Sequence, residues 1–400
     1  MVRAFVHNAR GLGGLRILVV TNVGQPVVHA YLSPLAALES VAELLIVRDR
    51  FDVELPPKAR VAAPPSWWPH TTLSELFSRA YLLRRAAARL RPHLLMTVHW
   101  FPDGPGVLRV ARRLGVPVVA NLVGGRAELI DGGRRVALSR LPRALKRWAE
   151  GYQRGRLNAT TVITCTGKAT SSWLRANGVV RPTLMTLHAA LDGTWFRDGP
   201  AARNIDVAYV GRANPDKRVD RMLNVLTAIG RRRPGTRVAV VSQTEADKVE
   251  LGRYRELTTA RAVLGDALHL TGRVERVSDV LGRAKVLLLT SDTEGRTLAV
   301  LEAMACGAVP VVTDVGDLAE ALDERRAGIT VPLGAGEERV VAALSDAVIS
   351  LLEDEPRRQA LAGRGREHVR REHDAGRTRD EWEIVIREAL AQRGTPCASA

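Results

Sequence analysis

Cysteine is scarce in this sequence, and the three residues present show no regular spacing. Cys165, Cys306 and Cys397 are too few for a disulfide framework and too far apart for a zinc site. No run of about 18 apolar residues occurs, which excludes a membrane-spanning helix. The segment Met1–Gly14 lacks the apolar centre of a secretory signal. Together these absences predict a protein of a reducing, cytoplasmic compartment.

Aromatic residues are also rare, at 4% of the 400 residues, whereas basic residues are abundant. The 59 basic and 43 acidic residues give a net charge of +16, which favours anionic partners such as phosphorylated substrates or acidic lipids. Nucleic acid is not an expected partner. Few aromatic side chains are present to stack on bases, and no motif of a known nucleic-acid-binding module occurs.

Short runs of valine, isoleucine and leucine alternate with longer amphipathic stretches along the chain. This repetition predicts parallel sheets with helices on both faces. Two series of strands indicate an α/β protein with two doubly wound, Rossmann-like domains, at residues 1–190 and 200–376, joined by the linker His188–Asn204. The expected strands are Leu15–Val20, Glu43–Val47, Leu94–Val98, Pro117–Leu122, Thr160–Thr164, Thr183–Leu187, Ile205–Val210, Arg237–Val241, Ala267–Leu270, Lys285–Thr290, Val309–Val312 and Gly328–Val331. The expected helices include Thr72–Leu90, Val219–Arg231, Leu298–Cys306, Glu337–Leu352, Pro356–His373 and Arg379–Ala391.

The loop after the strand Ile205–Val210 carries two cations where a helix begins. Gly211 permits a sharp turn after the strand. Arg212 and Lys217 follow, and the helix expected from Val219 adds the partial positive charge of its N-terminus. Ligands of open α/β sheets bind beyond the carboxyl ends of the strands, so this loop could hold a phosphate or diphosphate. A solvated basic loop is an equally good interpretation of these residues alone.

A second loop, after the strand Lys285–Thr290, places two glutamates eight positions apart. Glu294 precedes the expected helix, and Glu302 lies within it among apolar residues, so its carboxylate should be at least partly buried. A carboxylate suits a pair of sugar hydroxyls, and Gly295 permits a ligand to approach the backbone. The alternative is that Glu294 caps the helix and Glu302 lies on the surface. The free N–H groups at the helix start, which would point at a bound anion, belong to Arg296, Thr297 and Leu298.

These two loops resemble those of the retaining GT-B glycosyltransferases of family 4, whose mark is a pair of glutamates separated by seven residues. The resemblance covers most of the chain, from about Leu15 to the final helix, and is strongest over Asp206–Gly376. It implies two Rossmann-like domains that face a cleft, with a C-terminal helix, residues 377–400, that crosses back to the first domain. The motifs that carry it are Gly211-Arg212…Lys217, Glu294-Gly295, Glu302-Ala303-Met304-Ala305-Cys306-Gly307, Pro310-Val311-Val312 and Asp314-Val315-Gly316.

The resemblance also implies a role for each matching residue. Arg212 and Lys217 would neutralise the diphosphate of a UDP-, GDP- or related nucleotide sugar. Glu294 would contact the donor sugar, Glu302 would hold the ribose hydroxyls, and the backbone from Gly295 onward would bind phosphate. The sugar would pass to an acceptor hydroxyl with retention of configuration. The family is metal-independent and this chain has no Asp-x-Asp motif, so neither a metal nor a cofactor is expected.

The first domain departs further from the family pattern. After its first strand the family often has two adjacent glycines and then a histidine. Gly24 and His29 fit this pattern, but Gln25 replaces the second glycine and Pro26 removes a backbone N–H.

A second departure follows the strand Pro117–Leu122, where the family usually has a histidine before a glycine pair. Val123 occupies the histidine position here, directly before Gly124. His99, in another stretch that resembles the family, is a candidate contact on the sugar or acceptor side. A structural histidine beneath a loop is the alternative.

The stretch Ser139–Arg156 is expected to form a basic amphipathic helix. Such a helix could lie on an anionic membrane, at its inner face. We favour the commoner alternative, in which the apolar stripe packs on the sheet and the basic face is solvated. The sequence points to no particular oligomeric state. The stripe consists of Leu138, Leu141, Leu145, Trp148 and Tyr152.

A glycosyltransferase is therefore favoured over two alternatives on the same scaffold. A GT-B sugar-nucleotide epimerase would convert its donor without an acceptor. A non-catalytic GT-B partner subunit is favoured by Val123 and Gln25, and opposed by the presence of both cations and both glutamates in the second domain.

Overall fold

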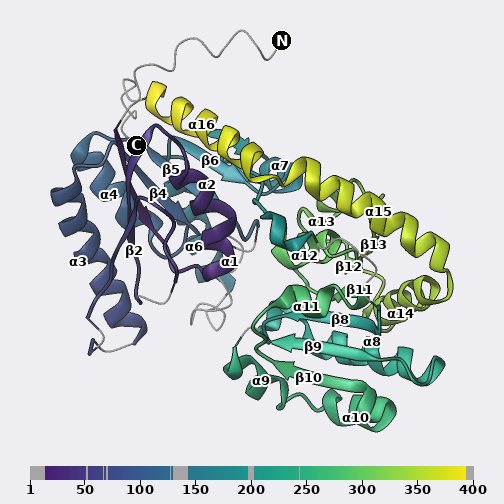
Figure 1. The fold of residues 1–400 in the computed structure, drawn as a ribbon. Helices are drawn as coiled ribbons and strands as arrows, with labels where there is room; N and C mark the ends of the chain where they lie inside the picture. Colours follow the sequence, from purple (N-terminus) through teal and green to yellow (C-terminus); the bar gives the residue numbers. More distant parts are fainter. Residues whose placement is uncertain are drawn as a thin grey trace. The chain divides into compact units, whose positions relative to one another are not determined.

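The computed structural model describes residues 14–392 except 51–52, 66, 69–70, 127, 129–142, 197–201 and 243. The chain divides into two compact units (Figure 1). Unit 1 runs to Ala190 and takes up the chain again from Ala375, and unit 2 comprises Leu191–Asp374. Each unit contains its own sheet, and we describe the two units separately.

Unit 1 is built on a parallel sheet of seven strands in the order β3-β2-β1-β4-β5-β6-β7. Its central strands are mainly apolar and buried, as expected where helices cover both faces of a sheet. The order reverses between β1 and β4, which are hydrogen-bonded neighbours. The strands are β1 Leu15–Val20, β2 Val41–Val47, β3 Ala59–Ala62, β4 Leu94–Val98, β5 Val118–Leu122, β6 Val162–Cys165 and β7 Thr183–Thr186.

The helices of unit 1 lie on both faces of this sheet. On one face a core of Leu18, Val20 and their neighbours packs under α3, α4 and α6. On the other, α2 packs against the last helix, α16, whose Trp382 Nε1 donates a hydrogen bond of 2.8 Å to the carbonyl of Tyr31. The helices are α1 Gln25–Val27, a π-helix Val28–Leu32, α2 Ser33–Ala36, α3 Thr72–Leu90, α4 Gly104–Leu114, α6 Arg143–Leu157, α7 Lys168–Ala176 and α16 Ala375–Ala391.

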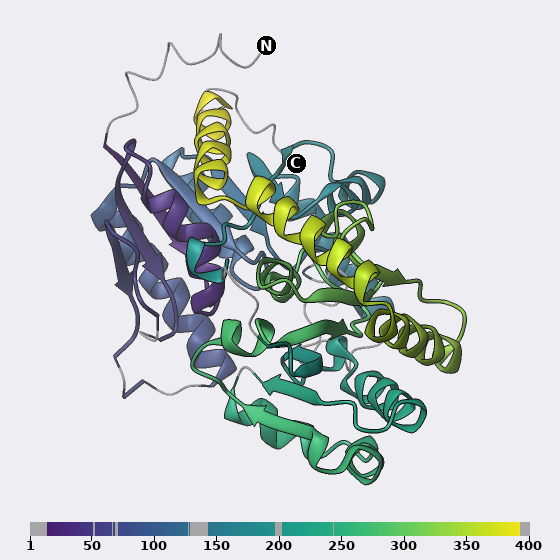
Figure 2. The same ribbon diagram turned by 45° about the vertical axis from the view of Figure 1, so that its right-hand side comes forward.

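Unit 2, whose strands are drawn in teal to green in Figure 2, contains a parallel sheet. The sheet has six strands in the order β10-β9-β8-β11-β12-β13, which is the order of a doubly wound fold. The strands are β8 Ile205–Gly211, β9 Val238–Ser242, β10 Leu268–Gly272, β11 Ala284–Leu289, β12 Val309–Thr313 and β13 Ile329–Val331. The α-helices are α8 Val219–Arg232, α9 Glu245–Leu251, α10 Glu256–Leu264, α11 Val277–Leu281, α12 Leu298–Ala305, α13 Leu318–Ala321, α14 Glu337–Glu353 and α15 Glu355–Glu372. A short 3₁₀ turn, Pro215–Lys217, precedes α8.

The predicted α/β class with two Rossmann-like sheets is confirmed, and each expected strand is present within two residues of its predicted bounds. The sequence analysis missed β3, an edge strand whose residues are half-buried or exposed and therefore form no apolar run. The last helix begins at Ala375 rather than at Arg379, and the tail from residue 393 lies outside the described residues.

The interpretation of the stretch Ser139–Arg156 needs correction. The structure describes a helix there from Arg143, while residues 139–142 and the stripe members Leu138 and Leu141 lie outside the described residues. The rest of the stripe does not pack on the sheet, because its side chains are exposed. Other residues of the helix face the interior. Among the positions of this helix whose burial is described, Gln153 and Leu157 are buried. The exposed stripe residues are Leu145, Trp148 and Tyr152.

Candidate functional site

The two predicted loops of unit 2 lie side by side, because the strands that precede them are neighbours. Strands β8 and β11 pair directly at the point where the strand order reverses. Beyond them, the N–H of Asp292 donates to the carbonyl of Asp216 at 2.9 Å. The hydroxyl of Thr290 lies 3.1 Å from the carbonyl oxygens of both Lys217 and Arg218. These bonds fix the loops at the sheet edge where open α/β folds bind their ligands.

Lys217 and Glu294, one from each loop, form an ion pair. The Glu294 carboxylate also accepts a hydrogen bond of 2.7 Å from the hydroxyl of Ser291. Only 8% of the Glu294 side chain and 15% of the Lys217 side chain are exposed. Glu294 therefore does not cap the helix, which was the alternative from sequence, and the predicted cation lies directly against the predicted acid.

A close backbone contact holds the Glu294 loop in place. Gly316 has a positive φ of 58°, and a Cβ at this position would overlap the carbonyl oxygen of Glu294. Only glycine avoids both the left-handed strain and this overlap. Gly316, which belongs to the quoted motif Asp314-Val315-Gly316, thus shapes the loop from the end of the next strand.

Glu302 lies on α12 and is buried, with 8% of the residue exposed. Burial raises the pKa of its carboxyl group from 4.5 to about 7. No side chain among the described residues forms a hydrogen bond or ion pair with this carboxylate. The surface alternative is therefore wrong. A buried carboxyl group without a protein partner is unfavourable by itself and is suited to accept hydroxyl groups from a ligand.

The start of α12 lies between Glu294 and Glu302 in the sequence and provides backbone N–H donors. Thr297 is the N-cap without a side-chain capping bond, and Leu298 is the first helical residue. No described backbone acceptor takes the N–H groups of Arg296 or Thr297. The Arg296 guanidinium lies inside unit 2, 2.6 Å from Glu320 and 3.5 Å from His373. Arg296 thus offers its backbone, and not its charge, at the start of the helix.

The first predicted loop begins after Gly211, which is the last residue of β8 and has no left-handed φ. A Cβ at Gly211 would lie 2.9 Å from the hydroxyl of Tyr209, a buried residue whose hydroxyl pKa is raised by burial. The Tyr209 hydroxyl lies 3.5 Å from the carbonyl of Arg212, at the edge of hydrogen-bonding distance. Arg212 itself is half-buried at the start of the loop.

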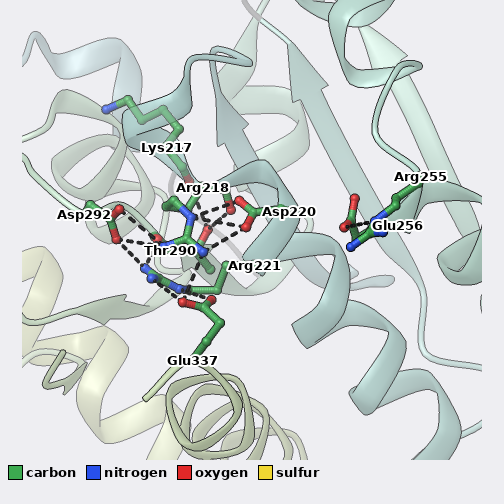
Figure 3. A network of polar contacts seen from close by, with 9 residues as sticks. All are labelled: Lys217, Arg218, Asp220, Arg221, Arg255, Glu256, Thr290, Asp292 and Glu337. Carbon is green, nitrogen blue, oxygen red and sulfur yellow. Dashed lines mark hydrogen bonds and ion pairs between the residues drawn. The ribbon is translucent and has the colours of Figure 1, made fainter. Parts of the chain in front are cut away.

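The sequence analysis missed a network of ion pairs beside Lys217 (Figure 3). Arg218 contacts Asp220, Asp292 and Glu337 at 2.8, 3.3 and 3.0 Å. Arg221 contacts Asp292 at 2.9 Å and Glu337 at 2.7 Å, and it donates to the carbonyl of Thr290 at 2.8 Å. The hydrogen bond from Arg221 holds the pKa of the Glu337 carboxyl below its usual range.

This network joins both loops to the start of α14. Arg218 has a left-handed backbone conformation, with φ 50° and ψ 57°. Residues other than glycine rarely adopt this conformation. The Lys217 side chain points away from the network in Figure 3, so the neighbouring Arg218 anchors the loop while Lys217 remains available to Glu294. The sequence signal for this arrangement is weak, because Glu337 is 116 residues from Arg221.

In unit 1 the predicted residues fall into two places. Gly24 is the N-cap of α1 with an ordinary φ of −74°, so no left-handed turn follows β1. His29 lies exposed in the π-helical turn, and no described residue forms a hydrogen bond with its ring. Gly24 accepts backbone hydrogen bonds from the N–H groups of Val27 and Val28, and His29 forms no ion pair with any described residue.

His99 and Gly124, by contrast, meet at one carboxylate. Glu128 is buried, and it lies 2.9 Å from His99 Nδ1. It also accepts hydrogen bonds from the N–H of Trp100 at 2.8 Å and of Gly124 at 2.5 Å. His99 has a positive φ of 67°, and about a third of its side chain is exposed. The sequence analysis missed Glu128, which no motif distinguished.

Comparisons with known proteins agree with this architecture. A model of the family described as "Glycosyltransferase Family 4" matches residues 42–192, and a model described as "Glycosyl transferases group 1" matches residues 204–354. A glycogen synthase of Mycobacterium tuberculosis is 25% identical over 293 residues. The match covers 71% of this chain and 66%, just under two thirds, of that relative.

Two solved structures have the same fold over nearly their whole length. Sucrose-phosphate synthase from Thermosynechococcus elongatus has a TM-score of 0.76 at 18% identity, covering 94% of this chain and 99% of that one. Anabaena Alr3699/HepE in complex with UDP-glucose has a TM-score of 0.68 at 14% identity, covering 93% and 99%. With both family models matched and both sheets in doubly wound order, this chain belongs to the GT-B glycosyltransferases of family 4.

Proposed function

We propose that this protein transfers a sugar from a nucleotide-diphosphate sugar to an acceptor hydroxyl, with retention of configuration. The observation that carries the proposal is the Lys217–Glu294 ion pair at the switch point of the unit 2 sheet, followed along the chain by α12 with the buried carboxyl group of Glu302, which has no side-chain partner among the described residues. The family supports the reaction class, and the bound UDP-glucose of the HepE complex supports the type of donor.

The charges of the site fit the leaving group of this reaction. When the bond between the anomeric carbon and the diphosphate oxygen breaks, negative charge develops on the diphosphate and the sugar becomes oxocarbenium-like. Lys217, Arg212 and the N–H groups at the start of α12 would stabilise the developing charge without a metal ion. We propose that Glu294 turns from Lys217 toward the sugar as the diphosphate takes its place at the cation.

Glu302 would hold the ribose of the donor. Its carboxylate can accept hydrogen bonds from two neighbouring hydroxyl groups, which would offset the unfavourable burial of the charge. For retention, the acceptor hydroxyl attacks the face that the diphosphate leaves. The new glycosidic bond forms as the old bond breaks, and the hydroxyl proton passes to the departing diphosphate oxygen.

A panel of nucleotide sugars tests this proposal. We expect UDP- or GDP-linked sugars to raise the unfolding temperature of the wild-type protein, and the effect to be lost in Glu302→Gln. Products formed with sugar acceptors are then analysed by NMR for the configuration of the new bond. Inversion would contradict the retaining mechanism. Conversion of the donor without an acceptor would indicate an epimerase, and absence of nucleotide binding would indicate a non-catalytic subunit.

A further inference from the structure

We propose that one face of unit 1, formed by the outer sides of α3, α4 and α6, binds an anionic lipid surface. This face is called the basic face below. The three helices cover the same side of the sheet, because α3, α4 and α6 contribute to one core with Leu18 and Val20 of β1. Helix α3 contacts α4, and α4 contacts α6. Their outer sides therefore form one continuous surface.

Charge is concentrated on these helices. Helix α3 contains four basic residues and one acidic residue, and α4 contains three basic residues and no acidic residue. Helix α6 contains five basic residues and one acidic residue. This is a net +10 of the +16 carried by the whole chain, within three helices. Arg79 is buried against Asp103. Six others are exposed and form no ion pair with any described residue: Arg84, Arg85, Arg89, Arg109, Arg112 and Arg113.

Exposed aromatic side chains lie among these cations. Phe77 and Tyr81 of α3 are one helical turn apart, and 72% of Phe77 is exposed. On α6, Trp148 is 67% exposed and stacks on Tyr152, with their ring centroids 5.8 Å apart, and the guanidinium of Arg156 lies 5.0 Å from the Tyr152 ring centroid. Every exposed aromatic residue in the described part of the chain belongs to unit 1, and all of them except Trp67 lie on α3 or α6.

This combination fits the boundary between lipid headgroups and acyl chains. Tryptophan and tyrosine rings prefer that boundary, and arginines attract anionic headgroups. A second copy of this chain is a poor occupant, because two faces of the same high positive charge repel each other. Nucleic acid is also less suitable, since the apolar side chains of Leu114 and Leu145 are exposed on the same helices and would remain in water. No helix among the described residues is long and apolar enough to cross a bilayer.

Vesicle co-sedimentation tests the proposal with three variants. We expect the wild-type protein to bind vesicles of phosphatidylcholine with phosphatidylglycerol, not vesicles of phosphatidylcholine alone, and to dissociate at high salt. The variant Arg112→Glu/Arg113→Glu should bind at least about tenfold more weakly, since each basic residue near such a surface contributes about 1 kcal/mol. The matched control is Arg231→Glu/Arg261→Glu, which changes the same charge at exposed positions of α8 and α10 in unit 2 and should bind like the wild type.

Trp148→Ala provides a test without a change of charge. Its side chain is largely exposed, so thermal unfolding should be unchanged while vesicle binding weakens. Equal binding to neutral and anionic vesicles would overturn the proposal, as would equal losses in the two charge-reversed variants, which would indicate net charge alone. Binding of nucleic acid or self-association without vesicle binding would also overturn it.

Discussion

The ammonium group of Lys217 pairs with the carboxylate of Glu294 across 77 residues of chain, and the two come together because β8 and β11 are neighbours. Each charge compensates the burial of the other. In a donor complex the same ammonium would face the diphosphate, so one cation serves both the free and the proposed bound state.

Lys217→Ala should lower transfer by a factor of about 10²–10³, the usual effect of removing one donor that stabilises developing charge. It should also destabilise unit 2 by about 3–5 kcal/mol, because Glu294 then remains as a buried, unpaired charge. The double variant Lys217→Ala/Glu294→Gln should recover much of the stability and none of the transfer. Steady-state kinetics and urea unfolding measure both effects. Lys248→Ala, at an exposed lysine of α9, is the control, and wild-type turnover in Lys217→Ala would contradict the assigned site.

Gly316→Ala should disrupt the Glu294 loop. The added Cβ overlaps the Glu294 carbonyl oxygen, in addition to the strain of a positive φ. Gly265→Ala is a matched control, since Gly265 has a similar φ of 54° and open space around its Cβ position. We expect nucleotide affinity, measured by calorimetry, to fall in Gly316→Ala alone, while both variants lose stability from backbone strain. Equal nucleotide affinities would show that the close contact does not shape the site.

Two substitutions at Arg218 separate its backbone strain from its ion pairs. Arg218→Ala removes the ion pairs and keeps a side chain at φ 50°, whereas Arg218→Gly removes the pairs and relieves the strain. The glycine variant should therefore be more stable than the alanine variant by about 1 kcal/mol. If the network positions Lys217, both variants should bind nucleotide more weakly than the wild type. Wild-type affinity in Arg218→Gly would mean that the ion pairs have no positioning role.

Much of the fold could be predicted because its strands are buried on both faces and form mainly apolar runs, as in Leu94–Val98, where Thr97 is the one polar residue. The two site loops could be predicted because glycines, cations and acids follow adjacent strand ends. Side-chain contacts between residues far apart in the sequence could not be predicted. Nothing near Arg221 indicates that its guanidinium binds Glu337, and nothing near His99 indicates that Glu128 holds its ring.

The orientation of α6 shows a further limit of sequence patterns. A spacing of three to four residues identifies an apolar stripe on a helix, but it does not determine whether that stripe faces the sheet or the solvent. In α6 the buried side includes Gln153, a polar residue, and the aromatic pair Trp148 and Tyr152 lies outside. Only the packing of the helix against its neighbours decides between the two.

Glu302 should make stability depend on pH. Its folded-state pKa of about 7 lies above the ordinary value of 4.5, so the folded protein retains a proton that the unfolded chain loses between these values. Stability therefore falls as pH rises from about 4.5 to about 7, by about 3 kcal/mol in all, and the loss is complete above that range. Glu302→Gln lacks this ionisation, so its stability relative to the wild type should rise over the same range and be nearly equal at lower pH.

Chemical unfolding of both proteins across pH measures this difference, and Glu338→Gln, at an exposed glutamate of α14, is the control. A stability difference that does not change with pH would show that Glu302 is not held in its protonated form. A bound nucleotide sugar should reduce the pH dependence in the wild type, because ribose hydroxyls that donate to the carboxylate favour its charged form and lower its pKa. The same ligand should leave the pH dependence of Glu302→Gln unchanged, which links the buried carboxyl group to the donor rather than to the packing of α12.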